Sequence, residues 1–297
     1  MVNVERLIYG IYPKSEKLRI RIGRWERGSV STVELRDSLV SETNELINML
    51  RNNGIDHYTG PLFNWFDIFR PFLTVAKGLQ TGPLTRYLET NTFYRIPEIH
   101  GKISLSNSIE LDIESVDGLP LPMYLGESNT VFLPGLKSLY EMSVKNGKRE
   151  SDFYSELSEV YSSILKVFPG KKVFIFEVVD PGEFSYSLYE DITEPQNIIL
   201  NLVTPVSGDN LSSISGKMYS VIAGSKEADT HIPDHHSIMK GRKLIGAHTT
   251  RIESLREMEN KIADIDGGIL VTTDDYLDFL PRKIADQKVQ LMGGFGR

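Results

Sequence analysis

Short apolar runs alternate with amphipathic stretches along most of the chain. Leu7 to Tyr12 predicts a buried strand. A helix is predicted from Ser31 to Leu50, because leucines recur at helical spacing and Ser31 forms a capping box with Glu34. An Asn-Gly pair then ends the helix. Since Ile55 to Thr59 follows as the end of a second strand, this part of the chain predicts a β–α–β unit.

The same alternation returns in the carboxyl-terminal half. Five apolar runs predict strands, at Val173 to Val179, Ile198 to Val203, Met218 to Ala223, Lys243 to Ala247 and Gly268 to Thr272. Helices are predicted from Ser254 to Ile262, behind a capping box of Thr250 and Glu253, and from Tyr276 to Leu291, with Pro281 in its early part. Strands that alternate with helices favour a parallel sheet, and 297 residues suit eight such units.

The middle of the chain has a different pattern. Lys102 to Ile113 alternates apolar and polar residues around Ser106-Asn107, which predicts a β-hairpin that decorates the sheet. No linker, tandem repeat or low-complexity stretch interrupts the sequence. We therefore expect one domain over residues 1–297, an α/β protein with the (β/α)8 TIM-barrel fold and an inserted β-hairpin.

Composition excludes several classes of function. The chain has no cysteine, so disulfides, thiolate metal sites and a cysteine nucleophile are ruled out. The net charge is −7 and the basic residues are scattered, which argues against nucleic acid as a partner. The apolar runs are too short to span a membrane, and Met1 to Arg6 has no apolar core of a signal peptide. We expect a cytoplasmic location.

Several stretches, in order, are similar to the cobalamin-independent methionine synthase family. They are Tyr9 to Ser15, Gly54 to Asp56, Gly60 to Pro71, Arg86 to Glu98 with Gly101, Gly246 to Ser254, and Val271 to Leu277. The similarity covers most of the chain, and its strength lies in the ordered set rather than in any one stretch. The resemblance implies a (β/α)8 barrel and methyl transfer from a reduced pterin to the thiol of homocysteine.

The same resemblance implies both a site residue and a departure from the family. His248 stands where the family has the histidine that protonates the departing pterin nitrogen. The family holds homocysteine on zinc with one His, two Cys and one Glu. Those positions fall here near Asn201 to Pro205, Ala223 and Asp275, and the glutamate that recognises the amino acid falls near Pro61. The chain therefore resembles the amino-terminal, zinc-less barrel of the family, and zinc is not expected.

Other candidate residues follow predicted strands or lie in aromatic segments. Asp180 and Asp275 come after strands, where each is a candidate ligand contact or a helix cap. Lys14 lies in the first loop. Asp67, Asn91 and Glu98 lie among aromatic rings that suit either a planar pterin or a hydrophobic core. A cluster of possible metal ligands is more typical of a solvated loop and comprises His231, Asp234, His235 and His236.

Three functional hypotheses follow. The leading one is an accessory module that binds a reduced folate or methanopterin methyl donor, or a separately encoded catalytic methionine synthase barrel. The second is an active methyltransferase with a replacement metal site made of Asp180, Asp275 and His248. The third is a metal-free decarboxylase of a related barrel family, which the arginines Arg19, Arg21, Arg24 and Arg27 would serve; their simplest reading is a solvated helix face.

Overall fold

The structure is a computed structural model of the 297-residue chain. It describes residues 3–63, 65, 67–87, 92–106, 115–116, 119–120, 128–179, 189, 192, 195–205, 218–224, 237–263 and 265–296. Within these ranges, none of the helices has the length and apolar character needed to cross a membrane.

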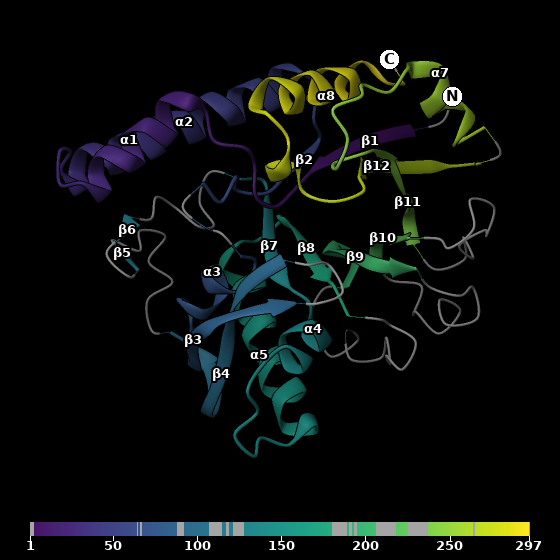
Figure 1. Ribbon diagram of the computed structural model, residues 1–297. Coiled ribbons are helices and arrows are strands. Elements are labelled where there is room, and N and C mark those ends of the chain that lie inside the picture. Colours follow the sequence, from purple (N-terminus) through teal and green to yellow (C-terminus); the bar gives the residue numbers. More distant parts are fainter. Residues whose placement is uncertain are drawn as a thin grey trace. The chain divides into compact units, whose positions relative to one another are not determined.

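Eight parallel strands form the central sheet, in the order β2-β1-β12-β11-β10-β9-β8-β7 (Figure 1). Strands that are neighbours in this order also follow one another in the sheet along the chain, except that the last strand, β12, pairs with the first, β1. The sheet is a nearly closed barrel. The predicted α/β barrel is therefore confirmed. The strands are β1 Asn3–Ile8, β2 His57–Tyr58, β7 Thr130–Pro134, β8 Lys172–Glu177, β9 Ile198–Pro205, β10 Met218–Gly224, β11 Ser237–Ile245 and β12 Gly268–Thr273.

The first and last strands close the sheet on one side. β1 and β12 pair in parallel from Asn3 opposite Gly268 to Arg6 opposite Val271. On the other side, β2 ends the sheet, and a side chain takes the place of a backbone ladder. The amide of Asn129 accepts a hydrogen bond from the Tyr58 N–H (2.8 Å) and donates one to the carbonyl of Asp56 (2.7 Å). We call these contacts the Asn129 clasp.

The helices flank the strands. They are α1 Glu16–Glu26, α2 Thr32–Asn52, α3 Arg70–Leu73, α4 Leu136–Glu141, α5 Glu150–Val167, α7 Leu255–Asn260 and α8 Arg282–Gly294, with 3-10 helices η3 Pro195–Asn197 and η5 Leu277–Phe279. The capping box predicted at the start of α2 is present, because Ser31 Oγ accepts from Glu34 N–H and Glu34 accepts from Ser31 N–H. That helix ends at Asn52, as expected.

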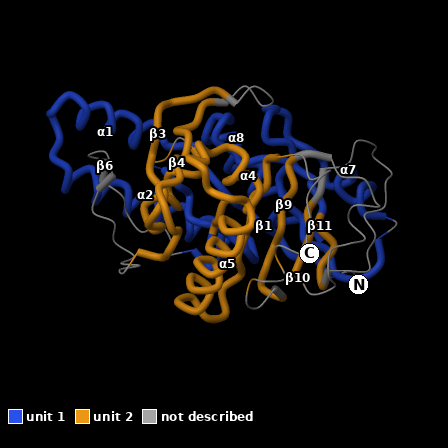
Figure 2. Tube along the Cα trace, turned by 90° about the horizontal axis from the view of Figure 1, so that it is seen from below, with its two compact units in different colours: residues 1–64, 110–131, 242–297 blue, residues 65–109, 132–241 orange. Residues whose placement is uncertain are grey.

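Packing divides the chain into two compact units (Figure 2). Unit 1 comprises residues 1–64, 110–131 and 242–297, and unit 2 comprises residues 65–109 and 132–241. In unit 1, the leucines of α2 pack with Met258 of α7 and Val289 of α8 against β1 and β12, in one buried core. The prediction of a single domain over residues 1–297 stays a prediction.

Unit 2 contains an inserted hairpin, but it is formed by a largely earlier part of the chain than the predicted residues Lys102 to Ile113. Antiparallel strands β3 Ala76–Tyr87 and β4 Thr92–Leu105 form it, and Leu105 pairs with Ala76. Lys102 lies near the end of β4. The second half of the hairpin predicted around Ser106-Asn107 lies outside the described residues, so that hairpin stays a prediction. Glycine and proline within β3 concealed this strand. In unit 1, a further short pair comprises β5 Ser115–Val116 and β6 Leu119–Pro120.

One predicted capping box and one predicted helix start were wrong, although the helix predicted from Ser254 does begin there. The cap of α7 is Ser254, which forms a capping box with Glu257, and not Thr250 with Glu253. The carboxyl-terminal helix α8 begins after Pro281, whereas Tyr276 precedes the short helix η5. Proline disfavours helical geometry in the residue before it, so one helix from Tyr276 onward is interrupted at this point.

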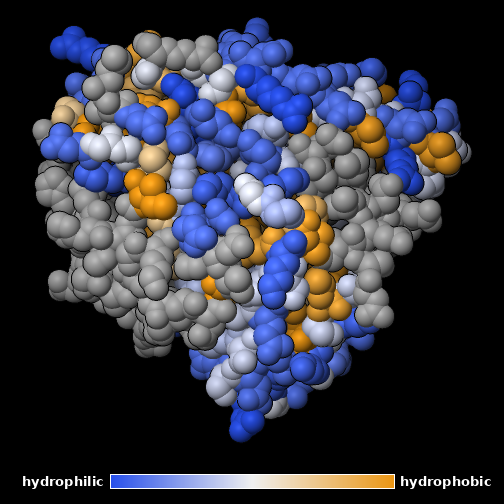
Figure 3. All heavy atoms as spheres, turned by 180° about the vertical axis from the view of Figure 1, so that it is seen from behind, coloured by the Kyte–Doolittle hydropathy of each residue, from blue (hydrophilic) through white to orange (hydrophobic). Residues whose placement is uncertain are grey.

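Exposed apolar side chains are scattered. On the face shown in Figure 3, apolar side chains lie among hydrophilic ones. Among the described residues, Val33, Leu84 and Ile238 are examples on three different elements. Single exposed apolar side chains of this kind are normal on a protein surface.

A buried carboxylate fastens α4 to the end of β8 in unit 2. Glu177 is 2% exposed and accepts hydrogen bonds from the N–H groups of Lys137 (3.0 Å) and Ser138 (2.9 Å). The hydroxyls of Ser138 and Tyr189 also donate to it. Gly135 is required beside it, because a Cβ there would lie 2.1 Å from the carboxyl group.

We therefore expect Glu177→Ala to lower the free energy of unfolding by about 3 kcal/mol, because buried donors lose their acceptor. Glu177→Gln, which keeps one acceptor oxygen, should cost less. Chemical denaturation followed by circular dichroism measures both. Exposed Glu159 on α5 provides the control, since Glu159→Ala should change stability little. Equal losses for Glu177→Ala and Glu159→Ala would contradict this role.

Candidate functional site

The loop that follows β11 presents a histidine beside a carboxylate. His248 Nε2 lies 3.2 Å from Asp275 Oδ2, and the His248 side chain is 58% exposed. Asp275 follows β12, and its other oxygen accepts the Tyr276 N–H at 2.8 Å. Burial raises the pKa of Asp275, although the hydrogen bond from Tyr276 and the nearby His248 oppose this effect. A histidine held by a carboxylate is suited to proton transfer.

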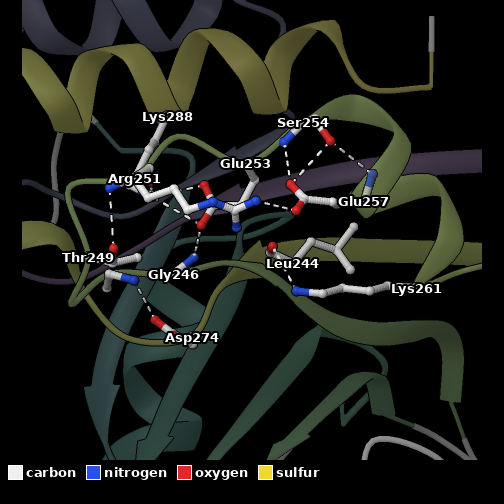
Figure 4. Close-up of polar contacts among 11 residues, drawn as sticks. Leu244, Gly246, Thr249, Arg251, Glu253, Ser254, Glu257, Lys261, Asp274 and Lys288 are labelled. Carbon is white, nitrogen blue, oxygen red and sulfur yellow. Dashed lines mark hydrogen bonds and ion pairs between the residues drawn. The ribbon is translucent and has the colours of Figure 1, made fainter.

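Backbone contacts join the two loops that carry this pair. Asp274 Oδ1 accepts the N–H of Ala247 at 2.6 Å, and the N–H of Asp274 donates to the carbonyl of Ile245 at 2.8 Å. Figure 4 shows Asp274 reaching this loop. His248 and Asp275 therefore lie together because their flanking residues are bonded.

The short helix η5 adds a second carboxyl group. Burial, reinforced by the charge of Asp275, raises the pKa of Asp278 to about 7, while Lys14 and His248 act in the opposite direction. The Oδ1 atom of Asp278 is buried and accepts no hydrogen bond from the part of the chain that the structure describes. This carboxyl group changes its charge near neutral pH, so it is able to donate as well as to accept a hydrogen bond.

Two lysines complete the charged cluster. Burial lowers the pKa of Lys14, which follows β1, although Asp278 opposes the shift. Burial also lowers the pKa of Lys243 on β11, to about 8, against the effect of Asp275 and Asp274. Titratable groups with opposite shifts in one place are typical of functional sites in enzymes.

Aromatic rings lie next to the charged groups. The rings of His248 and Phe279 have centroids 5.6 Å apart, and those of Phe279 and Tyr276 are stacked at 6.4 Å. Phe279 is 57% exposed, so its ring is open to solvent beside these groups. We call His248, Tyr276 and Phe279 the aromatic ledge. It offers a flat ligand a stacking surface with hydrogen-bonding groups at its side.

The structure brings together three of the residues that the sequence identified, namely Lys14, His248 and Asp275, all in unit 1. Asp180 and Asn91 lie outside the described residues, as does the cluster His231, Asp234, His235 and His236. A site that combines Asp180 with His248 stays a prediction.

Asp67 and Glu98 belong to unit 2, where each has identified neighbours. Asp67 is buried and accepts the backbone N–H groups of Phe69, Arg70 and Arg95, at 3.0, 2.9 and 3.3 Å. It therefore joins α3 to the hairpin. Glu98 on β4 lies 3.1 Å from His100 Nε2. Their ligand-binding roles stay predictions.

The arginines of the decarboxylase hypothesis lie on or beside α1. Arg19, Arg24 and Arg27 are exposed, and Arg21 lines a surface pocket of about 420 Å³ with residues of α2. This exposure is typical of a solvated helix face.

The residues present do not fit the family's zinc site. The chain has no cysteine, so the two thiolates are absent. The described residues contain no group of three or more His, Asp or Glu placed to hold a metal ion. At the end of β9, Asn201 and its neighbours occupy the positions where the resemblance places the family's His and Cys.

Sequence reasoning missed Asp278, Lys243 and Phe279. Asp278 and Phe279 were assigned to the interior of one long helix, which concealed that they belong to the loop after β12. Lys243 could have been noticed because it lies inside a predicted strand, and a lysine is seldom buried unless its charge is paired.

Two solved structures are similar to this chain over most of its length. A candidate vitamin-B12-independent methionine synthase from Listeria monocytogenes has a TM-score of 0.68 and 12% identity, over 96% of this chain and 94% of that one. A B12-independent methionine synthase from a Shewanella species, in complex with selenomethionine, has a TM-score of 0.64 and 12% identity, over 89% and 88%. No protein-family model and no curated protein sequence matches the chain. At this identity the likeness shows the fold alone, a methionine-synthase-like barrel.

The titration of Asp278 predicts how stability depends on pH. The pKa of this carboxyl group is about 7 in the folded protein, above that of the unfolded chain, so the folded state binds the proton more tightly. Its contribution is fully present below about pH 4 and is lost as the pH rises through 7.

We expect Asp278→Asn to lose less stability than the wild type between about pH 4 and pH 8, by on the order of 1–2 kcal/mol. Urea denaturation across this range measures the difference. Asp266→Asn, at an exposed position, is the matched control and should follow the wild type. Parallel profiles for the wild type and Asp278→Asn would show that Asp278 has an ordinary pKa.

Proposed function

We propose that this chain is a zinc-less, pterin-binding module related to methionine synthases, and that it takes the reduced pterin at the aromatic ledge. The observation that carries this proposal is the exposed Phe279 ring, stacked on Tyr276 and next to Asp275 and Asp278. A pterin is a flat heterocycle with an aminopyrimidine edge. It needs a stacking surface and side-chain oxygens that accept from that edge.

Each group of the site has a part in this proposal. Phe279 stacks on the face of the pterin. Asp278, with a pKa of about 7, bonds the polar edge through its carboxyl group in either protonation state. The His248–Asp275 pair supplies a proton to the ring nitrogen from which a methyl group departs. The electron pair of the broken carbon–nitrogen bond stays on that nitrogen and accepts this proton.

The methyl acceptor belongs to a different chain in this proposal. A free thiol is mostly protonated at neutral pH and a poor nucleophile, and the family activates it by binding the sulfur to zinc. Because this chain lacks that ligand set, we propose that it works with a separately encoded catalytic barrel in methionine biosynthesis. The donor is a reduced folate or methanopterin derivative.

The binding proposal predicts that titration calorimetry detects a methyl-tetrahydropterin and that Phe279→Ala weakens its binding at least tenfold, because the stacking surface is lost. Phe93→Ala is a closely matched control, since Phe93 on β4 is also 57% exposed. Phe93 also belongs to the aromatic segment that the sequence suggested as a ligand site. A loss of affinity with Phe93→Ala and not with Phe279→Ala would move the site to the hairpin.

The zinc-less proposal predicts less than about a tenth of an equivalent of zinc per purified chain, because the thiolate ligands are absent. A specific zinc site would hold about one equivalent. Elemental analysis of protein purified without an affinity tag measures this. The protein alone should not form methionine from a methyl-pterin and homocysteine. One equivalent of zinc together with methionine formation would favour the active methyltransferase instead.

A further inference from the structure

A buried lysine on α8 contacts the loop after β11, which carries His248; we call residues 246–254 the histidine loop. Lys288 is 0% exposed, and its ammonium group donates to both oxygens of Glu253, at 2.8 and 3.1 Å. It also donates to the carbonyl of Arg251 at 2.6 Å. Figure 4 shows Lys288 extending from its helix toward these groups. All three bonds of the ammonium group therefore end on the loop that carries His248.

Glu253 passes this constraint to the other end of the loop. Its Oε1 accepts the N–H of Gly246 at 2.9 Å. Burial alone would raise the pKa of Glu253, but the bonds from Lys288 and Gly246 outweigh it and lower the pKa. The ion pair thus holds Gly246 on one side of His248 and Arg251 on the other.

Glu253 is available for this role because a neighbour caps the next helix. Ser254 and Glu257 form the capping box of α7, and the exposed Arg251 side chain pairs with Glu257. A buried ion pair contributes little net stability compared with apolar residues of the same size. Its geometric effect on the loop is therefore the more informative property.

We propose that Glu253 and Lys288 are a positioning pair that sets the place of the His248 ring against Asp275 and Phe279. Within the described part of the chain, the hydrogen bond and ring contact of His248 are with Asp275 and Phe279, and not with either of these two residues. The pair closes the segment 246–251 at both ends, while Asp274 holds the N–H of Ala247 between them. The inference concerns the orientation of His248 and holds for any ligand of the site.

The test measures the place of the His248 ring directly by NMR. In the wild type we expect a nuclear Overhauser effect between the His248 and Phe279 rings and slow hydrogen exchange at the amides of Gly246 and Ala247. Lys288→Met keeps the length of the side chain but removes its charge. It should abolish the ring contact and speed the exchange of both amides at least tenfold. Unchanged values in folded Lys288→Met would overturn the proposal.

Two further variants separate position from stability. Glu253→Gln keeps an oxygen for Gly246 and should give a smaller effect, and it serves if Lys288→Met does not fold. Exchanging the charges, with Glu253→Lys and Lys288→Glu, restores an ion pair but leaves the Gly246 N–H without its acceptor. This double variant should recover stability without recovering the ring contact. Recovery of both would show that the pair is only a stabilising contact.

Arg251→Met provides the matched control in the same loop. The side chain of Arg251 is 64% exposed and pairs with Glu257, so its loss should leave the ring contact unchanged. An effect equal to that of Lys288→Met would overturn the assignment to the buried pair. None of these readouts involves a ligand, so their failure is distinguishable from a failure of pterin binding.

Discussion

The need to pair two cations of the last helix organises unit 1. Lys288 is fully buried and Arg282 is 20% exposed, and an ammonium or guanidinium group in such places is costly unless its donors are bonded. Lys288 is bonded by the Glu253 carboxylate and the Arg251 carbonyl of the histidine loop. Arg282 is bonded by Glu42 of α2 at 3.0 Å, by Asp286 and by the carbonyl of Pro13. The loop of Lys14 and the loop of His248 are therefore both attached to α8.

This attachment explains why the site lies where it does. Tyr12 donates to Asp286 of α8 at 2.8 Å, and Glu42 accepts the N–H of Ser15 at 2.7 Å, so the first loop is bonded on both sides of Lys14. The short helix with Asp278 directly precedes α8. Three separate stretches of sequence thus meet through one helix, although that helix contributes none of the groups of the charged cluster.

Local signals predicted much of the fold. The capping box of α2 and the apolar strands β8, β9 and β12 were identified because their patterns depend only on near neighbours in sequence. The 18-residue helix α5 carried a usable repeat, with Phe153, Leu157 and Ile164 on one face, and was overlooked.

The site was less predictable, for a physical reason. Glu253 has the sequence spacing of a capping residue, yet its partner is 35 residues away on α8. The spacing shows that a glutamate is available near a helix start, but it does not show which cation will be buried opposite. Asp278 likewise acquires its raised pKa from burial and from Asp275, which only the fold brings about. His248 could be identified from the sequence because its loop resembles the histidine loop of the family. The fold is shared with methionine synthase structures at 12% identity, whereas function depends on the residues of the site and not on the fold.

The Asn129 clasp also bears on how such a barrel accepts new sequence. Between β2 and β7 the chain leaves the sheet for more than a hairpin, and it returns at a seam where one side-chain amide bonds Tyr58 and Asp56. A backbone ladder fixes the register of every residue along two strands, so a long excursion must return in step with it. Among the described residues, the only backbone groups that the Asn129 amide bonds are those of Asp56 and Tyr58, so it imposes no register on a strand. Segments inserted between β2 and β7 therefore leave the remaining strand pairs with their partners.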